Sequence, residues 1–241
     1  MRIAAAIGVL ILIVGVIVYF VARRKPLAHG GVMSYGDLRQ RLIQDAQSSP
    51  PPERHALPSR PQGLDTRLPA SVGEEFRASF PETPDTGRAL MDIVFRVQES
   101  VRNELLALDQ DVDWYELLSP ERRAVLICLD CEGEVSNGGF DQYFLNSAGD
   151  GARFAPDAFR LIGENTVAAL IERANAVFPG GPSQFRPERL RQMGRLTDSD
   201  RARWNSLNKE FYSPACGGGG AALTSMPKFI HDHMSEFFKP Q

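Results

Sequence analysis

The stretch SPERRAVLICLDCEGEVSNGGFDQYF, residues 119–144, decides the fold of this chain. Ser119 followed by Pro120 is typical of a helix start, because a serine side chain caps the first turn and proline fits its first position. Apolar residues then recur as far as Val135 without the strict alternation of a half-buried strand. The stretch therefore predicts a helix from Pro120 to about Val135, followed by a short aromatic segment over Phe140–Phe144.

The rest of the C-terminal sequence has the same helical periodicity. Asn137-Gly138-Gly139 favours the end of a helix, because asparagine and glycine accept left-handed backbone angles. Further helices are expected over residues 87–108, 156–177, 187–193, 198–212 and 227–238, with a loop at the glycine run 216–220. We therefore expect residues 87–241 to form one all-α domain of about six helices, which is large enough to bury a core.

The N-terminus differs from this domain. Residues 3–22, IAAAIGVLILIVGVIVYFVA, carry no charge, and a helix of that length matches the apolar core of a bilayer. The run ends in Arg23-Arg24-Lys25 without a small-residue cleavage site, which favours a transmembrane anchor over a cleaved signal peptide. More basic residues follow the run than precede it, so we expect a single-pass membrane protein with its C-terminal domain in the cytoplasm.

Residues 26–86 are expected to connect the anchor, residues 1–25, to the domain. Ser34 is predicted to cap a short helix over Tyr35–Ala46. Residues 48–86 hold eight of the chain's 17 prolines and few large aliphatic residues. That composition is typical of an extended spacer, because it buries too little apolar surface to offset its ordering entropy.

The formal net charge of −3 conceals a separation of charge along the chain. Residues 89–150 contain 13 acidic and four basic residues, whereas residues 151–241 contain nine acidic and 12 basic ones. Either an acidic surface binds a basic partner, or the two halves pair with each other. The partner-binding acids predicted for the first case are Asp109, Asp111, Asp113, Glu116, Glu132, Glu134 and Asp141. A pI of about 5.9 argues against direct nucleic-acid binding.

A longer signature carries a family resemblance. Glu132–Gly151, EGEVSNGGFDQYFLNSAGDG, together with the later stretches AFRLIGENTVAALIERANAVFPGG and LNKEFY, resembles the C-terminal domain family of bacterial DNA-mimic proteins over about residues 90–240. The resemblance implies an all-helical, acidic, dimeric protein that occupies the DNA-binding face of a transcription factor. The signature residues are Asn137, Gly138, Gly139, Phe140, Gln142, Tyr143, Phe144 and Asn146. They form either a helix–helix corner, in which Phe140, Tyr143 and Phe144 enter the core, or a polar loop that presents Asn137, Asp141, Gln142 and Asn146 to a ligand.

Other patterns favour a structural interpretation. Cys128 and Cys131 have the spacing of half a zinc site or a redox pair, but they also share one face of the expected helix, and no second CxxC accompanies them. His231 and His233 are two positions apart on an expected helix, so their rings diverge. The sequence therefore predicts no catalytic residue, no metal site and no cofactor.

These features and the family resemblance together predict a single-pass protein of a bacterial inner membrane. It is expected to be a membrane-anchored protein-interaction module whose acidic face binds a basic protein surface, with DNA mimicry as the most specific form. A scaffold protein of the cell envelope is the first alternative. A metal- or thiol-dependent enzyme is the second.

Overall fold

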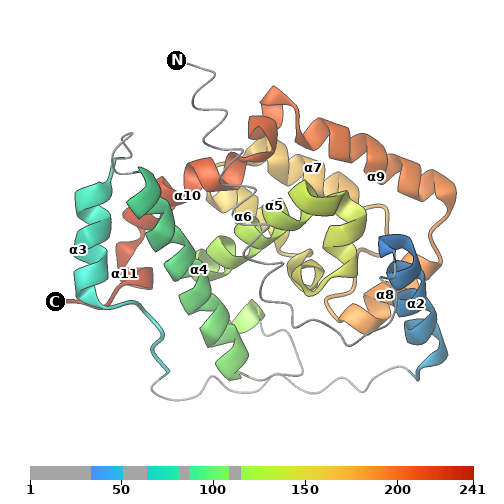
Figure 1. Cartoon of the computed structure of the whole chain (residues 1–241), viewed down its shortest axis with the longest axis horizontal. Coiled ribbons are helices and arrows are strands. Elements are labelled where there is room, and N and C mark those ends of the chain that lie inside the picture. Colours follow the sequence, from blue (N-terminus) through green and yellow to red (C-terminus); the bar gives the residue numbers. More distant parts are fainter. Residues whose placement is uncertain (1–33, 51–63, 82–86, 109–114) are drawn as a thin grey trace. The chain divides into compact units, whose positions relative to one another are not determined.

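The computed structural model describes residues 34–50, 64–81, 87–108 and 115–241 (Figure 1). The predicted transmembrane anchor lies outside them, and no helix within them combines the length and hydropathy needed to cross a bilayer. The chain divides into two compact units, Met1–Gln40 and Arg41–Gln241. The second contains the helical domain.

The described residues form ten α-helices and three short 3₁₀ helices. Among the described residues, β-type pairing is limited to one isolated parallel bridge, so the predicted all-α class is confirmed. The number of helices exceeds the expected six. The α-helices are α2 (Tyr35–Ser48), α3 (Ala70–Ser79), α4 (Gly87–Leu108), α5 (Pro120–Leu145), α6 (Ala155–Leu161), α7 (Asn165–Asn175), α8 (Arg186–Gly194), α9 (Asp198–Phe211), α10 (Ala221–Asp232) and α11 (Met234–Phe237). The 3₁₀ helices are η1 (Tyr115–Leu117), η2 (Ser147–Gly151) and η3 (Pro214–Gly219).

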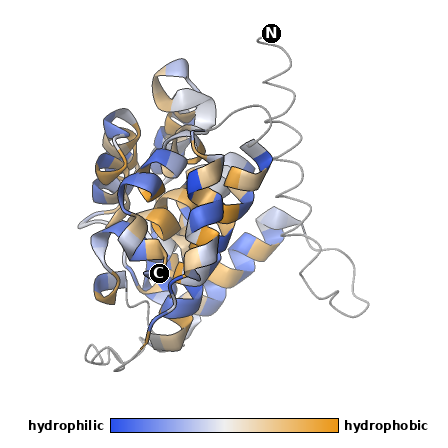
Figure 2. Cartoon of the chain, turned by 90° about the vertical axis from the view of Figure 1, so that its left-hand side faces the viewer, coloured by the Kyte–Doolittle hydropathy of each residue, from blue (hydrophilic) through white to orange (hydrophobic). Residues whose placement is uncertain are grey.

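Helix α5 is the centre of the folded unit. As predicted, Ser119 caps it, accepting a hydrogen bond from the Arg122 amide at 3.3 Å, and Pro120 occupies the first turn. The consecutive residues 124–129 are all buried, so this part of the helix is enclosed on every side. Helices α4, α6, α8, α9, α10 and α11 pack around it. Figure 2 shows the resulting pattern, with apolar turns among the packed helices and hydrophilic turns toward the outside.

Helix α3 corrects the spacer prediction over residues 64–81. Its Phe76 is fully buried, and a Cβ on Gly73 would lie 3.0 Å from the ring of Phe238. Before it, the Leu68 amide donates to the Phe237 carbonyl and the Lys239 amide donates to the Leu68 carbonyl, both at 2.8 Å. The folded unit therefore begins before residue 87. The signal was an apolar residue at every fourth position from Leu64, which the proline content obscured.

Two predicted helices have different bounds in the structure. The helix expected over 156–177 is divided into α6 and α7 at Gly163, whose φ of 91° ends the first helix. The helix expected from Pro227 begins at Ala221, so this proline lies inside α10. Its missing hydrogen bond is tolerated there because the flanking residues Met226 and Phe229 are buried in the core.

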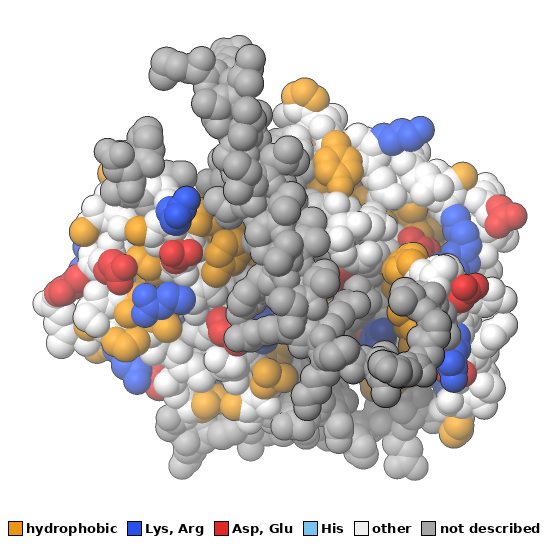
Figure 3. Space-filling model, viewed as in Figure 1, with side chains coloured by type: hydrophobic (Ala, Val, Ile, Leu, Met, Phe, Trp, Pro, Cys, Tyr) orange, Lys and Arg blue, Asp and Glu red, His pale blue; other side chains and the backbone are white. Residues whose placement is uncertain are grey.

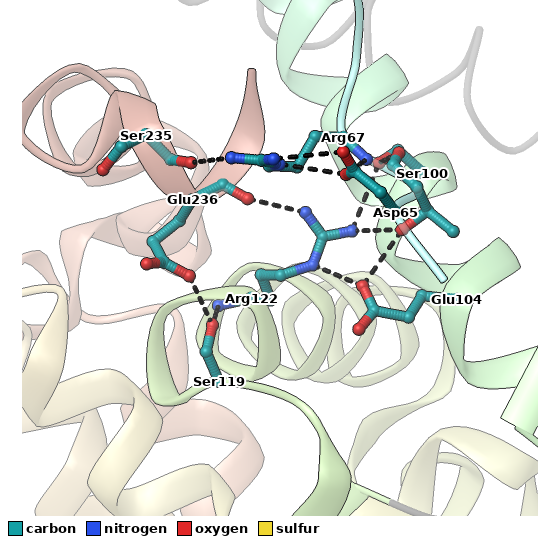
Figure 4. Close-up of polar contacts among 9 residues, drawn as sticks. Asp65, Arg67, Ser100, Glu104, Ser119, Arg122, Ser235 and Glu236 are labelled. Carbon is teal, nitrogen blue, oxygen red and sulfur yellow. Dashed lines mark hydrogen bonds and ion pairs between the residues drawn. The ribbon is translucent and has the colours of Figure 1, made fainter. Parts of the chain in front are cut away.

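A buried ion pair joins α4 to α5 (Figure 4). The Arg122 Nε lies 2.6 Å from the Glu104 Oε2, and both side chains are at most 5% exposed. The same guanidinium donates at 2.7 Å to the Thr66 hydroxyl and at 2.7 Å to the Glu236 carbonyl. One side chain thus connects the segment before α3, helices α4 and α5, and the C-terminal α11.

We expect Glu104→Gln to lower the free energy of unfolding by about 3–5 kcal/mol, because it leaves the buried Arg122 without its counter-charge. The matched control is Glu75→Gln, which removes a half-exposed partner 3.7 Å from Arg96 and should cost less than about 1 kcal/mol. Denaturant titration of the full-length protein in detergent checks both values. Equal losses in the two variants would contradict this role for the pair.

Candidate functional site

The signature segment contains a sharp break in α5. Gly138 and Gly139 depart from helical backbone angles. Gly139 has φ 75° and ψ −173°, a conformation that residues other than glycine rarely adopt. At the break, the Phe140 amide donates to the Asn208 Oδ1 of α9 at 2.9 Å. The Tyr212 hydroxyl, one turn further along, donates to the Ser136 carbonyl at 3.0 Å. Two separate stretches of the family resemblance, NGGF and LNKEFY, therefore meet at this break.

The aromatic residues of the signature enter the core. Phe140, Tyr143 and Phe144 are fully buried. The Phe144 ring lies 4.9 Å from the ring of Trp204 and 4.9 Å from the ring of Phe178. Such aromatic contacts stabilise the resumed helix beyond the area that they bury. The structure thus places these residues as the scaffold of a helix–helix corner.

The polar signature residues form hydrogen bonds across the break. The Glu134 Oε2 accepts hydrogen bonds from the Gln142 amide at 2.7 Å and from the Asn146 amide at 2.8 Å. Asn137 and Gly138 are exposed. Gln142 and Asn146 are therefore occupied by an internal carboxylate, and Asn137 is the signature side chain that faces solvent.

Glu132 does not lie on the predicted acidic face, because its side chain is buried. Its carboxylate accepts hydrogen bonds from the amides of Ala222 and Leu223 at the start of α10, and it is 3% exposed. Burial raises the pKa of Glu132 from 4.5 to about 7, and the two amide hydrogen bonds oppose part of that rise. This carboxylate joins α5 to α10 and cannot contact a partner.

The other predicted acids lie in different settings. Asp109, Asp111 and Asp113 lie outside the described residues. Glu116 is exposed and accepts a hydrogen bond from Gln184 at 3.1 Å. Asp141 pairs with Arg201 at 3.2 Å. The described members of the set therefore do not form one open face.

Acidic and basic halves of the sequence pair with each other in the structure. Besides Asp141 with Arg201, the buried Asp150 pairs with the fully buried Arg189. Within the acidic half, Asp130 pairs with Arg102 at 2.6 Å. On the uncovered parts of the face in Figure 3, acidic and basic side chains are interspersed. Much of the apparent acidic field is thus neutralised inside the fold.

The described residues contain no cluster of three or more side chains suited to hold a metal ion. Cys128 and Cys131 are buried free thiols, and burial raises the pKa of both well above the ordinary value. A thiol in this state is a weak nucleophile, because the thiolate is the reactive form. Their role in α5 is therefore that of small apolar core residues.

The fold is thus an all-α domain built on a broken central helix, whose signature residues are chiefly structural. Residues 116–233 match the family model described as DMP19-like protein, a family of DNA mimics. The match confirms the resemblance over these residues. Helices α2, α3 and α4 precede it. Comparisons with curated proteins and with solved structures found no match.

The buried Glu132 predicts a pH dependence of stability. Because its pKa is raised to about 7 in the folded protein, the folded state holds a proton that the unfolded state releases near pH 4.5. The free energy of unfolding should therefore fall as the pH rises from about 4.5 to 7, and this contribution should stay constant above. Denaturant titrations of full-length protein across this range measure the fall.

In Glu132→Gln this fall should become smaller, because the titrating group is gone. Glu99→Gln, which removes an exposed carboxylate of α4, is the control and should keep the wild-type slope. A wild-type slope in Glu132→Gln would show that other groups cause the pH dependence.

Proposed function

We propose that this protein is a membrane-anchored interaction module whose DMP19-like domain binds a basic protein surface. The family match supports a protein-interaction role of the DNA-mimic kind. The proposal extends to a DNA-binding protein as the partner and to a homodimer as the active form. Binding is non-covalent and needs no cofactor.

The proposal rests on a stretch of sequence that is rich in acidic residues and contains no basic residue. Residues 103–121 contain six acidic residues and no lysine or arginine. Among the described ones, Glu104 is neutralised by Arg122, whereas Glu116 is exposed. Asp109, Asp111 and Asp113 lie in the connection between α4 and η1.

The acidic surface is therefore narrower than the whole 89–150 half. Carboxylates elsewhere in that half, such as Asp130, Glu132 and Asp150, are bound within the fold and contribute little to an external field. The connection between α4 and α5 has no such internal cations in its sequence. An uncompensated acidic run attracts a basic surface and steers its association.

Replacing Asp109, Asp111 and Asp113 together by asparagine should weaken capture of a basic partner and reduce the salt dependence of what remains. The charge-matched control replaces the exposed acids Glu74, Glu75 and Asp92 of α3 and α4 by amides. Affinity purification of the full-length protein from membranes at two salt concentrations, with identification of the captured proteins, is the measurement. Capture that is insensitive both to salt and to the aspartate changes would exclude the electrostatic mechanism.

The anchor proposal rests on residues 3–22 and their basic flank. We expect the full-length protein in the membrane fraction after a high-salt or alkaline wash, because a spanning helix resists both. Protease added to spheroplasts should leave the domain intact, and protease added to inverted vesicles should degrade it. Release by the wash would contradict the anchor, and the reverse protease pattern would contradict the orientation.

A further inference from the structure

A small cavity lies where the first turn of α5 meets α6. Its volume is about 200 Å³, which is below the usual range of sites for drug-sized molecules, so it fits a single ring or one branched chain. Two of its lining residues are charged, Arg123 and Asp157. The others present apolar walls: Pro120, Phe154, Ala158 and Leu161.

Arg123 is half-buried and lacks a carboxylate partner. Its Nη1 donates a long hydrogen bond of 3.5 Å to the Tyr115 carbonyl. Its guanidinium carbon lies 4.7 Å from the centre of the Phe154 ring, a cation–π contact that supplies no hydrogen-bond acceptor. Among the described residues, no carboxylate forms an ion pair with this guanidinium. Because a guanidinium carries several N–H donors, most of those of Arg123 remain available to a ligand.

The acidic residue of the lining does not pair with Arg123. The Asp157 carboxylate accepts a hydrogen bond from the Arg160 Nη1 at 2.9 Å, and its side chain is 87% exposed. Leu161, on the same helix, is 42% exposed. These two residues therefore lie at the rim, where the cavity opens to solvent and a ligand can enter.

The lining defines the chemistry of a ligand. The apolar walls favour an apolar group, because its burial removes it from water. The guanidinium of Arg123 matches the two oxygens of a carboxylate, which it binds through charge-assisted hydrogen bonds in a planar, two-pronged geometry. The cavity is too small for a large molecule, so both groups must belong to one small acid.

We propose that this cavity binds a small carboxylate that carries one apolar group, such as an arylacetic acid. The carboxylate pairs with Arg123, and the apolar group packs against Phe154, Ala158 and Leu161. The site goes beyond the proposed function, because it adds a small-molecule ligand to a protein-binding module. It requires neither the membrane anchor nor a protein partner, so it can be tested separately from both.

Fluorine NMR of para-fluorophenylacetate tests the site, with para-fluorophenylacetamide as the neutral match. Each compound is titrated into the full-length protein in detergent, and its line broadening is measured. The acid should bind with a dissociation constant of about 1 mM or tighter, in keeping with its few atoms. The amide should bind about tenfold more weakly, because it makes no charge-assisted hydrogen bonds with the arginine.

Two variants locate the site. Arg123→Gln should weaken binding of the acid about tenfold and leave that of the amide unchanged. Ala158→Leu fills the cavity and should weaken both compounds. The matched control is Arg153→Gln, which removes an exposed arginine next to Phe154 in the sequence but outside the cavity lining. It should leave the affinity for the acid unchanged. Amide protection of α5 shows that each variant remains folded.

Equal binding of acid and amide, or no binding of the acid at about 10 mM, would overturn the proposal. Unchanged binding of the acid in Arg123→Gln would overturn it as well. An equal loss in Arg123→Gln and Arg153→Gln would replace the site with a general attraction of anions to the arginines of this surface. Should Ala158→Leu fail to fold, the comparison of the two arginine variants decides alone.

Discussion

The guanidinium of Arg189 is the group on which the region around the α5 break depends. It is fully buried and donates to the carbonyls of Phe144 at 2.8 Å, Asn146 at 2.9 Å and Ser183 at 2.8 Å, while Asp150 supplies the counter-charge. A charge at this depth is tolerated because its donors are satisfied. It fixes α8 to the end of α5. The end of α8 also packs against Ile43 and Gln47 of α2.

The same requirement explains the sequence after the break. A Cβ on Gly149 would lie 2.7 Å from the Tyr143 carbonyl and 2.9 Å from the Arg189 Nε, so a larger residue would displace the guanidinium. The last residues of the signature, NSAGDG, therefore surround Arg189. Asn146 supplies a carbonyl acceptor, Asp150 supplies the counter-charge, and Gly149 leaves space for the guanidinium. Asn146, which the sequence analysis considered as part of a polar, ligand-presenting loop, thus contributes its carbonyl to the hydrogen bonds of a buried charge.

Charge pairing also limits how the domain can act on a partner. Carboxylates held by Arg102, Arg122, Arg189 and Arg201 stabilise the fold and are not available as a phosphate-like array. The longest remaining acidic run by sequence is residues 103–121, which hold six acidic residues and no lysine or arginine.

The sequence by itself determined what depends on local chemistry. Ser119 and Pro120 start α5, Gly138 and Gly139 break it, and helical periodicity yields an all-α fold with a recognisable family signature. Only the tertiary structure decided which carboxylates face solvent, because Glu132 and Asp150 are buried by partners far along the chain. It likewise decided that α3 folds within a proline-rich stretch and that Pro227 lies inside α10. In each case burial against distant residues outweighs the local preference, and composition does not contain that information.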